Sequence, residues 1–151
     1  MIGEGTDPWS RDYGTVTINN QVTLMTYNPN YIKKSIASSI QESFIKVCEQ
    51  YPSIISTPFR RCPIIVDGGN LVYNNDGKRL ITTSRILSDN PNLSEQGIIH
   101  QLQTYLSVNQ VVILPQEKDE TTGHSDGMVS IVGNNVLIMG SLKHAHLLEC
   151  I

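Results

Sequence analysis

The sequence has no long apolar run. Hydrophobic residues make up 39% of the chain, and no uninterrupted apolar segment approaches the roughly 20 residues that a membrane-spanning helix needs. Met1 is followed by small and acidic residues rather than by a basic and then apolar leader, so the sequence predicts no secretion signal. Together these absences predict a globular protein with no membrane partner.

Positive charge is also scarce. The chain has 11 Lys and Arg against 14 Asp and Glu, for a net charge of -3, and its only basic pairs are Lys33-Lys34 and Arg60-Arg61. A surface that binds nucleic acid needs clustered basic residues. We therefore expect no nucleic-acid partner.

Closely spaced cysteines and metal-ligand motifs are missing as well. Cys48, Cys62 and Cys150 are odd in number and far apart, a pattern typical of free thiols in a reducing compartment such as the cytoplasm. His144 and His146 lie in a helical stretch, where alternate residues face apart. The sequence therefore predicts no disulfide frame, no metal site and no cofactor.

What the sequence does contain is a weak internal repeat. Asn-Asn pairs at 19–20, 74–75 and 134–135 lie between apolar runs, and each is preceded at a similar distance by an acidic residue: Asp12, Asp67 and Asp126. Asn tolerates positive φ and closes hairpins. A repeat of this size indicates one supersecondary unit used several times.

The first two units predict the same order of strand, strand, helix and strand. In the first unit these elements are expected at 15–18, 22–26, 35–50 and 63–66. In the second they are expected at 70–73, 79–82, a helix capped by Ser94, and 111–114. On the first helix, helical spacing predicts a single buried face, made of Ile36, Ile40, Phe44, Val47 and Cys48.

The third unit is shorter. Strands are expected at 128–132 and 136–139, and 141–151 has room for one short helix but not for the closing strand. Since each unit buries its apolar face against the next, a chain that stops inside a unit is typical of a fragment. We therefore expect one partial α/β domain over 1–151, with modules at about 12–67, 67–115 and 126–151.

Units arranged around an axis would bring their acidic residues together. Asp12, Asp67 and Asp126 would then face a common pocket beside His124. Like charges at close range persist where a cation binds, and a guanidinium, with its planar fork of N–H groups, suits paired carboxylates better than this residue spacing suits a metal. Each Asp-Gly pair alone is ordinary turn chemistry, so the prediction rests on the joint pattern.

Three ordered motifs resemble the agmatine deiminase and bacterial peptidylarginine deiminase family. They are Trp9-Ser10-Arg11-Asp12-Tyr13-Gly14, Asp67-Gly68-Gly69-Asn70 and Gly123-His124-Ser125-Asp126-Gly127. The resemblance implies a pentein-like α/β propeller built of strand-strand-helix-strand modules, of which about two and a half would be present. It also implies a small guanidinium substrate, hydrolysed to a ureido product and ammonia.

The resemblance further implies roles for individual residues. His124 would transfer protons, and Asp12 and Asp126 would hold the guanidinium as the other catalytic residues. Trp9, Arg11 and Asp67 would line the substrate pocket.

The family's nucleophile is a Cys in a Gly-rich segment near the end of a longer chain, and this sequence lacks that motif. Cys150, at an apolar helical end, is interpreted as a packing residue. Two interpretations follow: a truncated deiminase domain that is inactive alone, or a degenerate guanidinium-binding module. We favour agmatine as substrate, with peptidylarginine as the alternative.

Overall fold

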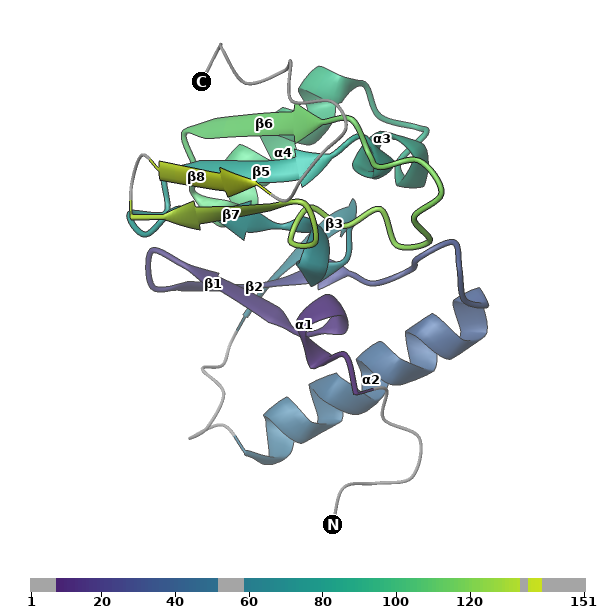
Figure 1. The fold of residues 1–151 in the computed structure, drawn as a ribbon. Helices are drawn as coiled ribbons and strands as arrows, with labels where there is room; N and C mark the ends of the chain where they lie inside the picture. Colours follow the sequence, from purple (N-terminus) through teal and green to yellow (C-terminus); the bar gives the residue numbers. More distant parts are fainter. Residues whose placement is uncertain (1–7, 52–58, 134–135, 140–151) are drawn as a thin grey trace.

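The computed structural model describes residues 8–51, 59–133 and 136–139, and it is a mixed α/β fold (Figure 1). The first sheet has the order β1-β2-β3, formed by β1 (Thr15–Ile18), β2 (Gln21–Thr26) and β3 (Arg60–Ile65). β1 pairs antiparallel with β2, and β2 pairs parallel with β3. Helix α2 (Lys34–Gln50) connects the two parallel strands.

The second sheet repeats this arrangement. It has the order β4-β5-β6, formed by β4 (Val72–Tyr73), β5 (Arg79–Thr83) and β6 (Gln110–Leu114). β4 pairs antiparallel with β5 and β5 pairs parallel with β6. The parallel strands are connected through α3 (Arg85–Asp89) and α4 (Glu95–Leu106). The predicted order of strands and long helices is therefore confirmed in both units.

The third sheet is an antiparallel pair, β7 (Val129–Val132) and β8 (Val136–Met139), as predicted. The Asn134-Asn135 tip and the predicted short helix at 141–151, with His144, His146 and Cys150, lie outside the described residues. Among the residues that the structure describes, the strands form three separate sheets, and none closes on itself.

The tips of successive hairpins touch one another. Asn19 and Asn20 adopt positive φ angles of 51° and 61°, as a tight hairpin turn requires. The Asn19 side chain donates from Nδ2 to the carbonyl oxygen of Gly77 in the second hairpin at 3.2 Å. The backbone N–H of Asn75 donates in turn to the carbonyl oxygen of Gly133 at 3.4 Å. Neighbouring units thus contact each other in chain order.

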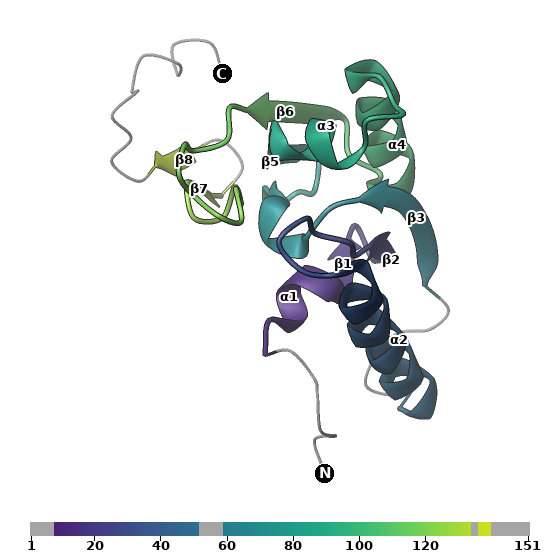
Figure 2. The ribbon, with the colours of Figure 1, turned by 90° about the vertical axis from the view of Figure 1, so that its right-hand side faces the viewer.

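Helix α4 contributes to the core between the first two sheets. It packs against both β3 and β6 (Figure 2), and its apolar face of Ile98, Leu102 and Leu106 is buried. The predicted cap is confirmed, because Ser94 Oγ accepts a hydrogen bond from the N–H of Gly97 at 3.1 Å. No helix in the described ranges is both long enough and apolar enough to cross a membrane.

The predicted buried face of α2 is partly wrong. Ile36 and Val47 are 50% and 43% exposed, whereas Ala37, Ile40 and Cys48 are buried. The buried stripe is rotated toward Gln41, whose side chain bonds the backbone of Tyr27 and Met25 in the neighbouring segment. This face packs Ala37 and Ile40 against Tyr13 and Tyr27, and a count of large apolar residues misses Ala37 and Gln41.

Short helical turns that the sequence did not predict begin the units. α1 (Ser10–Tyr13) precedes β1, η1 (Gly68–Asn70) precedes β4, and a turn at 126–128 precedes β7. Asp12 lies within α1, Asp67 directly precedes η1, and Asp126 starts the third turn. The three turns therefore carry the acidic residues singled out by the repeat, although at positions that are not strictly equivalent.

Candidate active site

His124 and Asp67 form the centre of the candidate site. Their side chains come from segments far apart in the sequence, the loop before β7 and the segment after β3, and His124 Nε2 lies 3.0 Å from Asp67 Oδ2. The Asp67 side chain is buried, at 4% exposure, and the His124 side chain is largely so, at 10%. Buried ionisable groups are stable only when paired, so this contact fixes the imidazole ring.

Asp12 approaches the other nitrogen of the ring. Its Oδ1 lies 3.9 Å from His124 Nδ1 and accepts a hydrogen bond from the N–H of Gly69 at 2.8 Å. A Cβ at position 69 would lie 2.5 Å from Nδ1 and 2.8 Å from Asp12 Oδ1. Glycine at this position is therefore what lets the carboxylate and the imidazole come together.

The electrostatic environment shifts two of these groups. Burial alone would lower the pKa of His124, but the hydrogen bond to Asp67 and the charges of Asp12, Asp67 and Asp126 outweigh it and raise the pKa above its ordinary value. Burial raises the pKa of Asp12, against the opposing effects of the Gly69 N–H and of His124. A His with a raised pKa beside carboxylates is suited to accept and return protons near neutral pH.

Asp126 lies beside this pair but is more exposed. Its backbone N–H donates to the carbonyl oxygen of Gly69 at 3.1 Å, which fixes it next to the site. Its carboxylate pairs with Arg11, at 3.2 Å from Nε, with the two side chains 37% and 62% exposed. The charge of Asp126 still reaches both His124 and Asp12. The carboxylates of Asp12, Asp67 and Asp126 thus gather around His124.

Trp9, another of the six predicted site residues, is 69% exposed. It lies directly before α1, and Arg11 follows within that helix. Their position beside Asp12 follows from the sequence, whereas a contact with substrate stays a prediction.

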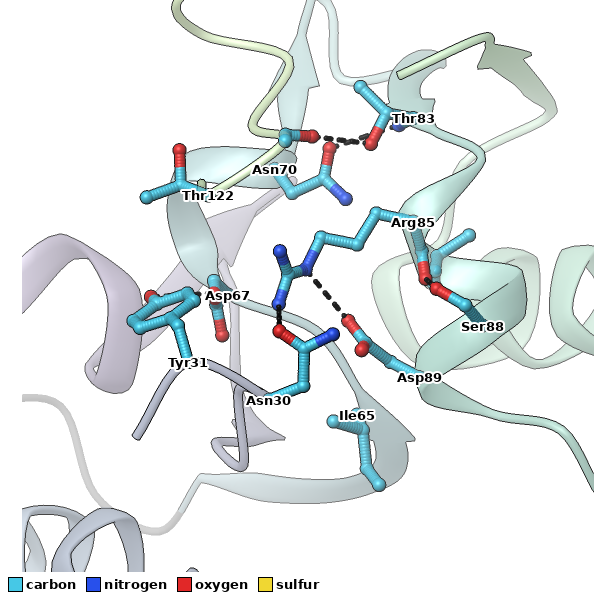
Figure 3. A network of polar contacts seen from close by, with 12 residues as sticks. Asn30, Tyr31, Ile65, Asp67, Asn70, Thr83, Arg85, Ser88, Asp89 and Thr122 are labelled. Atoms are coloured by element: carbon cyan, nitrogen blue, oxygen red, sulfur yellow. Dashed lines mark hydrogen bonds and ion pairs between the residues drawn. The ribbon is translucent and has the colours of Figure 1, made fainter. Parts of the chain in front are cut away.

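The sequence did not predict Tyr31 or Arg85 as site residues. The hydroxyl of Tyr31 donates to Asp67 Oδ2 at 2.9 Å, and Arg85 lies behind it, 4% exposed, among Asn30, Asp89 and the Tyr31 ring (Figure 3). Tyr31 follows β2 and Arg85 follows β5, and each of these strands pairs parallel with the next. Loops after the carboxyl ends of parallel strands carry sites in α/β folds, which is the signal that could have found them.

The described cysteines do not have the character of nucleophiles. Cys48 and Cys62 are free and buried, and burial raises the pKa of the Cys62 thiol to about 11. The thiolate, not the thiol, attacks. Within the described ranges, no group of three or more His, Cys, Asp or Glu residues is arranged to hold a metal ion.

Fold and site together define a class of protein. It is a mixed α/β protein built of repeated sheet units, and the segments that begin these units bring three carboxylates together around one histidine. The profile of the Porphyromonas-type peptidyl-arginine deiminase family matches residues 3–147. The chain belongs to this family, as the three motifs indicated.

Relatives and solved structures agree. A Vibrio parahaemolyticus protein with the provisional name agmatine deiminase is 27% identical over 149 residues, covering 88% of this chain and 39% of its own. An agmatine deiminase from C. jejuni has the same fold, with a TM-score of 0.72, 20% identity, and coverage of 88% of this chain and 41% of its own. That of Enterococcus faecalis has a TM-score of 0.64 and 24% identity, covering 83% and 37%. The chain thus spans about two fifths of the length of these proteins.

Proposed function

We propose that this chain provides the guanidinium-binding and proton-transfer half of an enzyme that deiminates agmatine. The observation that carries the proposal is the position of His124, bonded through Nε2 to Asp67 and facing Asp12 through Nδ1. A histidine that carries protons, surrounded by carboxylates, suits a reaction that binds a guanidinium cation and then releases neutral ammonia.

Each residue has a part in the proposed reaction. Asp12 and Asp126 accept hydrogen bonds from the substrate's N–H groups, since carboxylates match the guanidinium fork. Because Asp67 holds Nε2, Nδ1 is the atom of His124 that exchanges protons with the substrate. Trp9 and Arg11 shape the pocket wall and fix the short helix α1, which carries Asp12.

The covalent step needs a thiolate that this chain does not supply. In the proposed reaction the thiolate attacks the guanidinium carbon, the C–N bond breaks, and ammonia leaves with a proton from His124. Water then adds to the same carbon, His124 takes its proton, and the C–S bond breaks to release the ureido product, N-carbamoylputrescine. A cysteine-to-serine variant of the C. jejuni enzyme holds substrate, in agreement with a cysteine nucleophile in such proteins.

The names of the relatives favour agmatine, and hence putrescine and polyamine metabolism, over protein citrullination. The family's description favours a peptidylarginine substrate, which remains the alternative enzyme function. A third candidate, a guanidinium-binding module without catalysis, is favoured by one contact: the Arg11 guanidinium already pairs with Asp126. The free thiols of Cys48 and Cys62 support a cytoplasmic location.

Ammonia release tests the proposal. The chain alone should release none from agmatine or arginine peptides above the buffer rate, because it lacks the attacking group. A protein extended downstream to the length of its relatives should release ammonia from agmatine, and its His124→Ala variant should be slower by roughly 10² to 10⁴. Measurable turnover by the chain alone, or no turnover of either substrate by the extended protein, would contradict the proposal.

Calorimetry with agmatine tests the binding role separately. On an extended protein without its nucleophile, Asp12→Ala and Asp126→Ala should each weaken binding by about 2 to 5 kcal/mol, because the buried cation loses its partner. Asp119→Asn, in an exposed loop, is the matched control and should bind as the parent does. If both alanine variants bind agmatine as tightly as the control, neither carboxylate holds the guanidinium.

A further inference from the structure

One oxygen of Asp67 has two partners. Oδ2 accepts the hydroxyl of Tyr31 at 2.9 Å and lies 3.0 Å from His124 Nε2. Asp67 is 4% exposed, so these two contacts take the place of water at that atom. A hydroxyl that donates to a carboxylate takes up part of its negative charge and makes it a weaker acceptor for a second donor.

The Tyr31 ring is itself held in place from behind. The Arg85 guanidinium lies 5.2 Å from the ring centroid, within range of a cation–π contact. Arg85 is fixed in turn by Asp89 at 3.1 Å and by Asn30 at 2.7 Å (Figure 3), and it also donates to the carbonyl oxygen of Thr121 at 3.0 Å. This cluster around the buried Arg85 connects the segment after β2 to α3 and to the loop that leads to His124.

We propose that Tyr31 is a positioning residue that sets the proton affinity of His124 through Asp67. The catalytic meaning of this inference rests on the proposed function, whereas the coupling itself does not. Tyr31 touches neither the imidazole nor Asp12 in any hydrogen bond of the described structure. Its hydrogen-bonded route to the imidazole is therefore the shared oxygen, and its hydroxyl also lies within electrostatic range of Asp12.

Other charges face the same imidazole and have to be kept constant in a test. Asp12, Asp126 and Glu120 lie on the segments around it, Asp89 acts from α3, and Arg85 is a buried cation that contacts the Tyr31 ring. Tyr31→Phe leaves all of these in place. It also keeps the aromatic ring over Arg85 and removes only the hydroxyl.

The experiment is an NMR titration of His124 in the chain, with its signal assigned by its loss in His124→Gln. Tyr31→Phe should raise the titration midpoint of His124 by about half a pH unit or more, since one hydrogen bond of about 1 kcal/mol no longer competes for Oδ2. Tyr73→Phe, on the exposed edge of β4, is the matched control and should leave the midpoint unchanged.

Repeating the titration in an Asp67→Asn variant tests whether Tyr31 acts through Asp67. In Asp67→Asn the carboxylate charge is gone, and adding Tyr31→Phe should then shift the midpoint little. No shift in the single variant, a fall instead of a rise, or an equal rise in the Asp67→Asn background would each overturn the proposal. Circular dichroism of each variant confirms that the fold is retained.

Activity separates this inference from the proposed function. In the extended protein, Tyr31→Phe should move the pH profile of deimination in the same direction as the titration. If the extended protein shows no deimination, the proposed function fails while the titration still decides the coupling. If deimination is present and the titration does not move, only the role of Tyr31 fails.

Discussion

The two sides of the candidate site differ in burial. On one side Asp67, His124 and Tyr31 form a largely buried hydrogen-bonded set, in which the Asp67 and His124 side chains are 4% and 10% exposed. On the other side Asp126 pairs with Arg11 at the surface, with side chains 37% and 62% exposed. In the low dielectric of the buried side a small change in distance alters a pKa, whereas exposed partners can be exchanged at little cost. The buried side is thus suited to set a proton affinity, and the exposed side to receive a ligand.

The largest expected difference between the two sides is in stability. Asp67→Ala should lower the free energy of unfolding by about 3 kcal/mol, because it leaves the Tyr31 hydroxyl and the buried imidazole without their partner. Asp126→Ala, its exposed counterpart, should lower it by less than about 1 kcal/mol. Urea denaturation of both variants measures the difference. Equal losses would mean that burial does not distinguish the two sides.

A smaller effect is expected in the pH dependence of stability. The pKa of His124 is raised in the folded state, so the stabilisation from its protonated form is complete below the unfolded value of about 6.5 and is lost as pH rises through the folded pKa. The difference in free energy of unfolding between the parent and His124→Gln, measured from pH 6 upward, should therefore shrink as the pH rises. His100→Gln, exposed on α4, is the control. A gap that widens with pH would contradict the raised pKa.

The smallest effect is expected from the surface pair. Arg11→Ala should change the free energy of unfolding by about 0 to 1 kcal/mol at low salt, and by less at 1 M salt, because exposed ion pairs are weak and are screened. Denaturation at two salt concentrations measures it. A loss above about 2 kcal/mol that persists in salt would show that Arg11 has a packing role.

The sequence predicted the long elements well because their signals are local. Asn19-Asn20 closes a hairpin by its own backbone preference, and Ser94 caps α4 with its own side chain. The repeat predicted that Asp12, Asp67 and Asp126 would lie beside His124, and Asp12 and Asp67 lie 3.9 Å and 3.0 Å from its ring nitrogens. The roles of these residues and the module boundaries remain predictions.

The elements that were missed depend on contacts across the chain. α1 and η1 are too short to be stable alone, and they form where their segments meet at Gly68 and Gly69. Tyr31 and Arg85 show no periodicity that marks them, because their partners lie 36 and 55 residues away. On α2, Gln41 faces the sheet through hydrogen bonds, so a pattern of apolar residues assigned the buried face to Ile36 and Val47 in error.

The peptide at Gly69 has a consequence for the order in which the molecule assembles. The Gly69–Asp12 and Asp67–His124 hydrogen bonds each span 57 residues, and Gly69 also accepts the N–H of Asp126. Contacts of such long range form only after the intervening loops have closed, which makes them slow to appear during folding. The hairpins and helices can therefore form first, each within its own unit. The contacts of the His124 imidazole with its carboxylates then form late, after the segments that carry Asp12, Asp67 and Asp126 have come together at Gly69.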